Sequence, residues 1–258
     1  MTLHVDRTGH IVTLRIDNPG RRNALDPALG AALREALASL REDRSARCVV
    51  ITGTGDSFCS GADLGALRHA ATGVLARREL LHSYYRAFLD LRELELPVVA
   101  AVNGPAVGAG LNLALCADVR VAGRSARFGA TFVRLGIHAG GGATALLTRL
   151  VGPGHAAELL LSGEIIDAER ALSIGLVERL VDDEDLATAA ASLATSIAIG
   201  APAVVRMTKR TLRLAEDAEF ASILELESLA QAASHDAPEA AEGWAAFRER
   251  RPPVFEDA

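Results

Sequence analysis

Two glycine-rich turns decide the fold of this chain, Gly53-Thr-Gly-Asp-Ser-Phe-Cys-Ser-Gly-Ala-Asp-Leu64 and Val102-Asn-Gly-Pro-Ala-Val-Gly-Ala-Gly-Leu111. Each turn follows an apolar run that predicts a buried strand, residues 48–52 and 97–102 respectively. Small residues let the backbone come close to a ligand, and each turn can direct one main-chain N–H at the same carbonyl oxygen. The turns are therefore candidate parts of an oxyanion hole; the alternative is that they are tight turns without a ligand.

The bulk composition is that of a globular protein. Of the 258 residues, 50% are hydrophobic and 23% are charged, which excludes a disordered chain. The formal net charge of −6, with no basic stripe, argues against nucleic acid as a partner. The first residues lack the apolar core of a signal peptide, and we find no apolar run of ~18 residues. We therefore expect a cytoplasmic protein that does not enter a membrane.

The cysteines indicate neither a disulfide framework nor a metal site. Cys48, Cys59 and Cys116 lie in or beside apolar runs, and their spacing fits neither arrangement. We expect buried thiols in a reducing compartment and no bound metal. The glycine spacing of residues 104–110 also does not fit a dinucleotide-binding loop.

Strand and helix patterns alternate through the first part of the chain. Period-two alternation in residues 10–17 predicts a strand, and Asp26-Pro27 is typical of the start of a helix running to about residue 41. A charged stretch at residues 74–93 predicts a helix, and residues 118–122 predict another strand.

After a third glycine cluster, Gly140-Gly-Gly142, the pattern changes to almost continuous helix. The expected helices are at residues 143–150, 154–162, 167–173, 183–199, 201–214 and 218–233. Interleaved strands and helices followed by helices alone predict an α/β core over residues 1–200 and a helical region over residues 201–258.

Five short motifs lie in order along nearly the whole chain. They are Asn18-Pro-Gly-Arg-Arg-Asn-Ala-Leu25, Phe58-Cys-Ser-Gly-Ala-Asp-Leu64, Pro97-Val-Val-Ala-Ala-Val-Asn-Gly104, Cys116-Ala-Asp118 and Leu161-Ser-Gly-Glu-Ile-Ile-Asp-Ala-Glu-Arg-Ala-Leu-Ser-Ile-Gly-Leu-Val177. With these motifs the chain resembles the enoyl-CoA hydratase/isomerase (crotonase) superfamily. One such motif is weak evidence, whereas five in the right order identify the family.

The resemblance implies a fold, a ligand and an assembly. The fold is an α/β spiral of ββα repeats with a C-terminal helical trimerisation region, and the assembly is a homotrimer or a dimer of trimers. The ligand is an acyl-CoA thioester, and no separate cofactor is implied because coenzyme A is part of the substrate. In this family two backbone N–H groups hold the thioester oxygen, which here would be those of Ala62 and Ala109, the latter preceded by Gly108.

The resemblance also places the adenine end of the ligand along the first turn and the segment before it. The residues implied are Arg22, Ala24, Asp63 and Leu64, with Arg22 as the phosphate contact. The alternative for Arg22 is a solvated surface arginine.

The sequence departs from the hydratase pattern where that pattern carries its proton-transfer groups. The hydratases use two glutamates; counted from Ala109 the first falls on Asn112, and counted from Phe128 the second falls on Phe132. A third position, at which other relatives keep a carboxylate, falls on Gly140. A positioned acid or base is worth ~10²–10⁴-fold in rate. Ordinary two-glutamate hydration is therefore not expected.

Other side chains are candidates for the missing role. His138 lies in the same loop as Gly140. Histidine is a side chain suited to proton transfer at physiological pH, so His138 is either a catalyst or a hydrogen-bonded loop histidine. Tyr85 lies in the predicted helix before the second turn. It is either an aromatic side chain beside the ligand or a catalyst. The amide of Asn112 either holds a water or a substrate carboxylate, or fills the space of a glutamate.

Two functional hypotheses remain open at this point. The first is an enzyme that stabilises the enolate of an acyl-CoA or enoyl-CoA thioester and uses a proton source other than glutamate, in a double-bond isomerisation, a decarboxylation or a slow hydration. Decarboxylation demands least, because loss of carbon dioxide generates the enolate without a base. The second is a non-catalytic acyl-CoA binding protein that kept the site and lost the chemistry.

Overall fold

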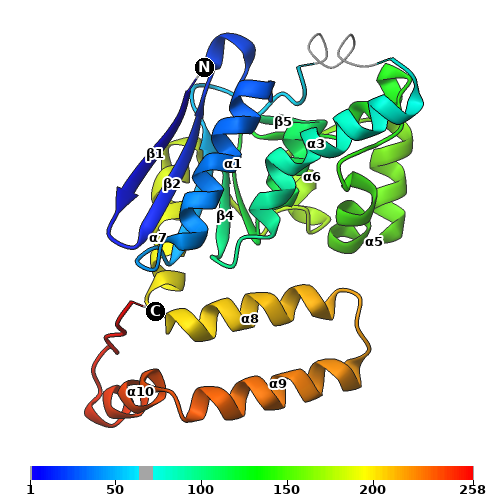
Figure 1. Ribbon diagram of the computed structural model, residues 1–258. Coiled ribbons are helices and arrows are strands. Elements are labelled where there is room, and N and C mark those ends of the chain that lie inside the picture. The colour runs from blue at the N-terminus through cyan, green and yellow to red at the C-terminus, as the bar shows by residue number, and fades with distance from the viewer. Residues whose placement is uncertain (1, 64–71, 258) are drawn as a thin grey trace.

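The computed structural model describes residues 2–63 and 72–257, and its centre is a six-stranded sheet in the order β1-β2-β3-β4-β6-β9 (Figure 1). β1 and β2 are antiparallel, and every later pairing in this sheet is parallel. The strands are β1 (Thr2–Thr8), β2 (Ile11–Asp17), β3 (Cys48–Gly53), β4 (Val98–Val102), β6 (Val119–Gly123) and β9 (Arg179–Val181).

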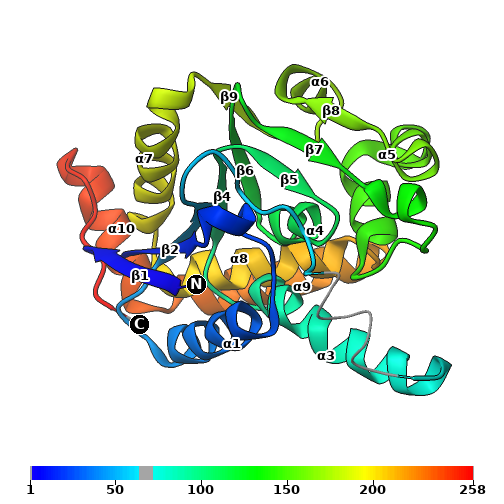
Figure 2. The same ribbon diagram turned by 90° about the horizontal axis from the view of Figure 1, so that it is seen from above.

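Both faces of the parallel part of this sheet are buried. Successive side chains of a strand point to opposite faces. Val49 and Ile51 therefore belong to the apolar cluster that includes α1 (Pro27–Glu42), whereas Cys48 and Val50 belong to the cluster that includes α7 (Leu186–Ala198). Figure 2 shows the two helices on opposite sides of the sheet. Helices on both faces explain why β3 and β4 are continuous apolar runs.

Helix α1 begins as its sequence predicts. The side chain of Asp26 accepts a hydrogen bond from the N–H of Leu29 at 2.9 Å, and Pro27 occupies the first turn, where its missing N–H costs nothing. One face of the helix, with Leu33 and Leu37, is buried against the sheet. Burying each such leucine contributes about 1.5–3 kcal/mol.

A second, three-stranded sheet carries the second glycine turn. Its order is β5-β7-β8, with β5 parallel to β7 and β7 antiparallel to β8. The bounds are β5 (Pro105–Val107), β7 (Arg127–Gly129) and β8 (Ile165–Asp167). An isolated parallel bridge between Cys59 and Ala106 connects the first turn to this sheet.

The remaining helices cover this framework. Within the described residues between α1 and α7, these helices are α3 (Val74–Arg92), α4 (Ala109–Leu115), α5 (Ala143–Ser162) and α6 (Ala168–Ser173). Short 3-10 segments are η1 (Pro19–Arg21), η2 (Thr131–Leu135) and η3 (Asp183–Asp185). In both views α3 lies on the same side of the molecule as α1 (Figures 1 and 2), and it contacts α4.

Three helices follow the α/β part of the chain, α8 (Pro202–Ala215), α9 (Phe220–His235) and α10 (Pro238–Glu249). They lie together beneath the sheet in Figure 1. Lys209 of α8 joins them to the core, because its ammonium donates to the carbonyl of Leu96 at 2.6 Å and pairs with Asp118 at 2.6 Å. Within the described residues no single helix is long and apolar enough to span a membrane; only η3–α7 and α8 taken together, across a bend of 106°, meet that length and composition.

The structure confirms some expectations about individual elements and corrects others. The helices expected at residues 143–150 and 154–162 are the two parts of α5, which the non-helical Gly152 separates with φ 75°. The later part of the chain is less helical than expected, because β8 and β9 interrupt it. Each of these strands has three residues, too few for a period-two pattern to be read from sequence. The expectation that the three cysteines are buried thiols is confirmed.

Candidate active site

The two glycine turns lie side by side because their backbones are hydrogen-bonded to each other. The N–H of Cys59 donates to the carbonyl of Pro105 at 3.0 Å, and the N–H of Val107 donates to the carbonyl of Cys59 at 3.1 Å. On its other side the first turn pairs with Leu25, whose N–H donates to Gly61 and whose carbonyl accepts from Asp63. The first turn is thus held from both sides.

Glycine is required where the turns approach most closely. A Cβ on Gly110 would lie 1.9 Å from the carbonyl oxygen of Cys59, and one on Gly61 would lie 2.6 Å from that of Val107. Gly61 also has φ 102°, which a residue with a side chain rarely adopts. The same Cβ position on Gly61 is 3.5 Å from the backbone nitrogen of Ala109, so the first turn reaches the start of α4.

Two backbone N–H groups at this meeting point have no acceptor within residues 2–63 and 72–257. Leu25 uses the carbonyl of Gly61 and the N–H of Asp63, so the intervening N–H of Ala62 points to the other side of the turn. The N–H of Ala109 opens α4, where helical N–H groups lack an intrahelical partner. Gly108 is fixed just before it by its own N–H, which donates to Gly129 at 2.8 Å. We call Gly61, Ala62, Gly108 and Ala109 the backbone half of the site.

Asn112 connects this backbone half to the third glycine cluster. It lies one helical turn after Ala109, and its backbone N–H donates to Gly108 at 3.1 Å. Its side-chain nitrogen Nδ2 donates to the carbonyl of Gly140 at 2.8 Å. The side chain is 1% exposed, and Oδ1 has no hydrogen-bond partner in the described structure. A buried acceptor without a donor is unusual and marks a place for a water or a ligand group.

Tyr85 reaches the same cluster from α3. A Cβ on Gly140 would lie 2.2 Å from the Tyr85 phenolic oxygen and 3.0 Å from its Cζ. The phenol thus fills the space that a side chain at position 140 would need. Burial raises the pKa of Tyr85, and a hydrogen bond from the Gly141 backbone opposes part of that rise. We call Tyr85, Asn112 and Gly140 the side-chain half of the site.

Phe132 and His138 take different positions in the loop before this cluster. Phe132 lies in η2, half-buried against the main apolar cluster. His138 is exposed, and its Nδ1 contacts the carbonyl of the neighbouring Ala139 at 2.6 Å. No hydrogen bond in the described structure joins His138 to Asn112 or Gly140.

The residues expected at the adenine end lie beside the first turn. Arg22 is exposed with φ 49°, and its carbonyl accepts from the N–H of Ser60 at 2.9 Å. Ala24 is half-buried two residues further on. Asp63 pairs with Arg21 at 2.9 Å. The sequence did not indicate this ion pair, because it cannot tell which of two adjacent arginines points toward Asp63. The 3-10 turn η1 sets the two side chains in different directions. Leu64 lies outside the described residues.

Thiol and metal chemistry find little support in the described part of the chain. Burial raises the pKa of Cys48, Cys59 and Cys116 to about 12, so these thiols stay protonated and unreactive near neutrality. Residues 2–63 and 72–257 contain no group of three His, Cys, Asp or Glu side chains placed to hold a metal ion.

The two joined sheets, with the glycine turns meeting at the start of a short helix, define an α/β protein of the crotonase fold. The family model for enoyl-CoA hydratase/isomerase matches residues 6–258. The chain belongs to this family, which acts on CoA thioesters.

Named relatives agree with this assignment over almost the full length of the chain. A probable enoyl-CoA hydratase of Mycobacterium tuberculosis is 44% identical over 256 residues, covering 96% of this chain and 97% of the relative. The (E)-benzylidenesuccinyl-CoA hydratase of Thauera aromatica is 36% identical over 259 residues, covering 100% of both chains. The crystal structure of an enoyl-CoA hydratase from Bacillus anthracis superimposes with a TM-score of 0.95 at 33% identity, again covering 100% of both chains.

Proposed function

We propose that the protein is an enzyme that binds an acyl-CoA or enoyl-CoA thioester and stabilises its enolate on the N–H groups of Ala62 and Ala109. The observation that carries the proposal is the close approach of Gly61 to the backbone nitrogen of Ala109, with neither alanine N–H engaged elsewhere in the described structure. Donors fixed in this way need no reorganisation when charge develops on the thioester oxygen, and each is worth ~10²–10³-fold in rate.

The residues at the three expected carboxylate positions limit the reactions that this enzyme can perform. Asn112, Phe132 and Gly140 stand where the family resemblance places carboxylates, and none of them transfers a proton. Activation of water by a glutamate is therefore not part of the proposed mechanism. Double-bond isomerisation, decarboxylation and slow hydration remain, since each passes through the same enolate.

The named relatives support an unsaturated thioester as one substrate. Those of Mycobacterium tuberculosis and Thauera aromatica are both hydratases by name, and the second acts on a benzylidenesuccinyl thioester. The buried Oδ1 of Asn112 has no partner in the described structure and accepts hydrogen bonds, so it suits a donor group of the ligand or a water rather than a carboxylate.

A non-catalytic acyl-CoA binding protein is the second candidate, and one observation favours it. All three positions expected to bear a carboxylate lack one, while the backbone half of the site is intact. Such a protein would hold the thioester and polarise its carbonyl without releasing a product.

Deuterium incorporation separates the two candidates. The purified protein is incubated in deuterated water with crotonyl-CoA, a 3-enoyl-CoA or methylmalonyl-CoA, and products are followed by mass spectrometry. A product peak, or deuterium at the α-carbon, supports the enzyme. Saturable binding of the thioesters with neither signal would reject the enzyme and establish the binding protein.

A second experiment tests the limit on hydration. In a variant that combines Asn112→Glu with Phe132→Glu, both carboxylates of the hydratase pattern are restored. Hydration of crotonyl-CoA that appears only in this variant shows that the native chain is not a dedicated hydratase. Equally fast hydration by the native chain would contradict the proposal.

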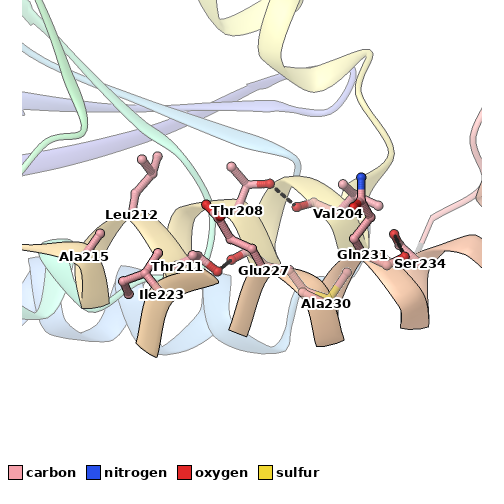
Figure 3. Close-up of a pocket in the computed structure, with 11 residues that line it drawn as sticks. Val204, Thr208, Thr211, Leu212, Ala215, Ile223, Glu227, Ala230, Gln231 and Ser234 are labelled. Carbon is pink, nitrogen blue, oxygen red and sulfur yellow. Dashed lines mark hydrogen bonds between the residues drawn. The ribbon is translucent and has the colours of Figure 1, made fainter. Parts of the chain in front are cut away.

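We also propose that the helical region assembles the chain into a homotrimer or a dimer of trimers. A groove between α8 and α9 is lined by apolar side chains such as Val204, Leu212 and Ile223 (Figure 3). The hydroxyls of Thr208 and Thr211 donate to carbonyls of their own helix (Figure 3). Their protons are therefore not available to a partner in the groove, and the groove is more apolar than its residue types indicate. Light scattering should give three or six times the chain mass; a monomer at micromolar concentration would contradict this.

A further inference from the structure

We propose that Tyr85 is the residue that delivers a proton to the α-carbon of the thioester enolate, and that position 140 is glycine because the Tyr85 hydroxyl occupies the space of a side chain there. The proposal rests on the proposed function, since it needs an enolate to protonate. It assigns a chemical role to a tyrosine at the point where carboxylates are missing.

The position of Tyr85 is fixed by its neighbours on α3. Its ring centroid lies 6.2 Å from that of Tyr84 and 6.1 Å from that of Phe88, and the side chain is half-buried against the main apolar cluster. Ring contacts at these distances favour tilted and edge-on packing. They hold the phenol in one direction, toward Gly140, rather than leaving it to move at the surface.

The hydroxyl of Tyr85 keeps its proton available. The Gly141 backbone donates to the phenolic oxygen, so that interaction uses a lone pair and not the O–H bond. Within the described residues the O–H itself has no hydrogen-bond acceptor. Tyr84 differs in this respect, because its hydroxyl donates to the carbonyl of Leu25 at 3.4 Å. Adjacent tyrosines on one helix thus have different roles: one O–H is committed to the fold and the other is not.

A short path joins Tyr85 to the backbone half of the site. The phenol packs against Gly140, the Gly140 carbonyl accepts from Asn112, and Asn112 lies one helical turn after Ala109. A thioester whose oxygen rests on the N–H of Ala109 has its α-carbon within a few bonds of that oxygen. The Tyr85 hydroxyl is therefore in the part of the site where that carbon must lie.

The other polar groups near this position are less suited to the task. Asn112 has no titratable proton, and its Nδ2 is already bonded to Gly140. His138 is exposed and contacts its own loop. Asp63 is paired with Arg21 at 2.9 Å. Tyr85 alone in this group combines a titratable proton, partial burial and contact with the third glycine cluster.

The atoms and electrons of the proton-transfer step balance with water as the only other reactant. The electron pair of the enolate forms the new C–H bond at the α-carbon, and the carbonyl C=O bond is restored. The electrons of the Tyr85 O–H bond remain on the phenolate oxygen, which regains a proton from solvent. Because burial raises the pKa of Tyr85, the phenol is neutral at pH 7 and acts as a donor rather than as a base.

Stereochemistry in deuterated water tests this role with Tyr85→Phe and with Tyr84→Phe as the matched control. The probes are crotonyl-CoA and methylmalonyl-CoA, with α-deuterated product analysed for the face that received deuterium. The wild-type protein and the control should deliver deuterium to one face at rates within about twofold of each other. Tyr85→Phe should lose ~10²–10⁴-fold in kcat, bind the thioesters as before, and give residual product deuterated on both faces.

The outcomes separate this proposal from the proposed function. One-sided delivery at the wild-type rate by Tyr85→Phe, with turnover intact, overturns the role of Tyr85 alone. Absence of turnover in the wild type overturns both. If Tyr85→Phe does not fold, 3-fluorotyrosine at position 85 keeps the ring size and lowers the phenol pKa. The alkaline limb of kcat should then move to lower pH, and an unmoved limb would overturn the assignment.

Discussion

The backbone half and the side-chain half of the site differ in what the sequence reveals of them. In the proposed function Ala62 and Ala109 act through main-chain N–H groups, and Gly61 and Gly108 allow the backbone shape that brings these groups together, which glycine-rich motifs signal directly. Tyr85, Asn112 and Gly140 come from three separate elements, and the contacts between them are made by side chains or allowed by the lack of one. The comparison teaches that, under the proposed function, the binding and polarisation of a thioester depend on local backbone motifs, whereas proton transfer depends on side chains brought together by the fold.

A large loss of rate is expected from removing a donor of the backbone half. Ala109→Pro replaces the N–H with a ring carbon at the first position of α4, where proline does not break a helix. We expect kcat to fall by ~10²–10³-fold. Val74→Pro is the matched control, because Val74 is also a first helical residue preceded by a glycine with positive φ, and it is 83% exposed. An equal loss in the control would remove the distinction between the two halves.

Within the side-chain half, the strongest effect on stability should come from filling the space at position 140. The backbone of Gly140 is not left-handed, so an alanine there would not be strained by its φ angle. The obstacle is the Tyr85 phenolic oxygen, which would lie 2.2 Å from the new Cβ. We expect Gly140→Ala to lower the free energy of unfolding by about 1–3 kcal/mol. Much of this loss should disappear when Tyr85→Ala is added, and urea denaturation of the four proteins gives the coupling energy. Strictly additive effects would show that the two residues do not meet.

A smaller loss is expected at Asn112. Asn112→Leu removes the donor to the Gly140 carbonyl but also removes the buried Oδ1 that has no partner. The Gly140 carbonyl keeps a hydrogen bond from the N–H of Ala143 at 3.3 Å, so we expect a decrease of only about 0.5–1.5 kcal/mol in the free energy of unfolding. Urea denaturation measures it. A loss above 3 kcal/mol would mean that Oδ1 has a partner, such as a bound water, that contributes to the fold.

The smallest effect is the change of the free energy of unfolding with pH. It sets the pH range in which variants of the two halves can be compared. Burial lowers the pKa of Lys209 to about 8, so its native form releases a proton before the unfolded form does, and stability rises as pH increases from 8 toward 10.5. Burial raises the pKa of the three thiols to about 12, so stability is lost as pH increases from 9 toward 12. We expect a maximum between pH 8 and 9, on the order of 0.5 kcal/mol above neutrality. Chemical denaturation across this range checks it; a steady decline from pH 7 would contradict the sign for Lys209.

Much of the fold could be predicted from the sequence, because its long elements have strong local signals. Residues 48–52 and 97–102 are unbroken apolar runs, and both are central strands. Asp26 and Pro27 begin α1 as expected. The three-residue strands β8 and β9 were missed because such segments depend on pairing with distant partners rather than on their own pattern. The division at residue 200 and the assembly through the helical region stay predictions.

The site could be predicted only in part, for a related reason. Counting along the motifs predicted that Asn112, Phe132 and Gly140 occupy the positions of carboxylates in relatives; this stays a prediction, and the structure shows where each residue lies. Counting did not show that the Tyr85 hydroxyl fills the space beside Gly140, because that contact joins residues on α3 and on the loop before α5. Nor did it distinguish Arg21, which pairs with Asp63, from the adjacent Arg22.

The central claim is that the N–H groups of Ala62 and Ala109 together polarise one thioester carbonyl, and isotope-edited infrared spectroscopy of bound ¹³C-carbonyl crotonyl-CoA tests it most directly. Two hydrogen bonds to the oxygen weaken the C=O bond, so the carbonyl band of the bound ligand should shift to lower wavenumber than in water. The shift should shrink in Ala109→Pro and persist in Tyr85→Phe. A bound ligand whose band is the same in the wild type and in Ala109→Pro would contradict the account.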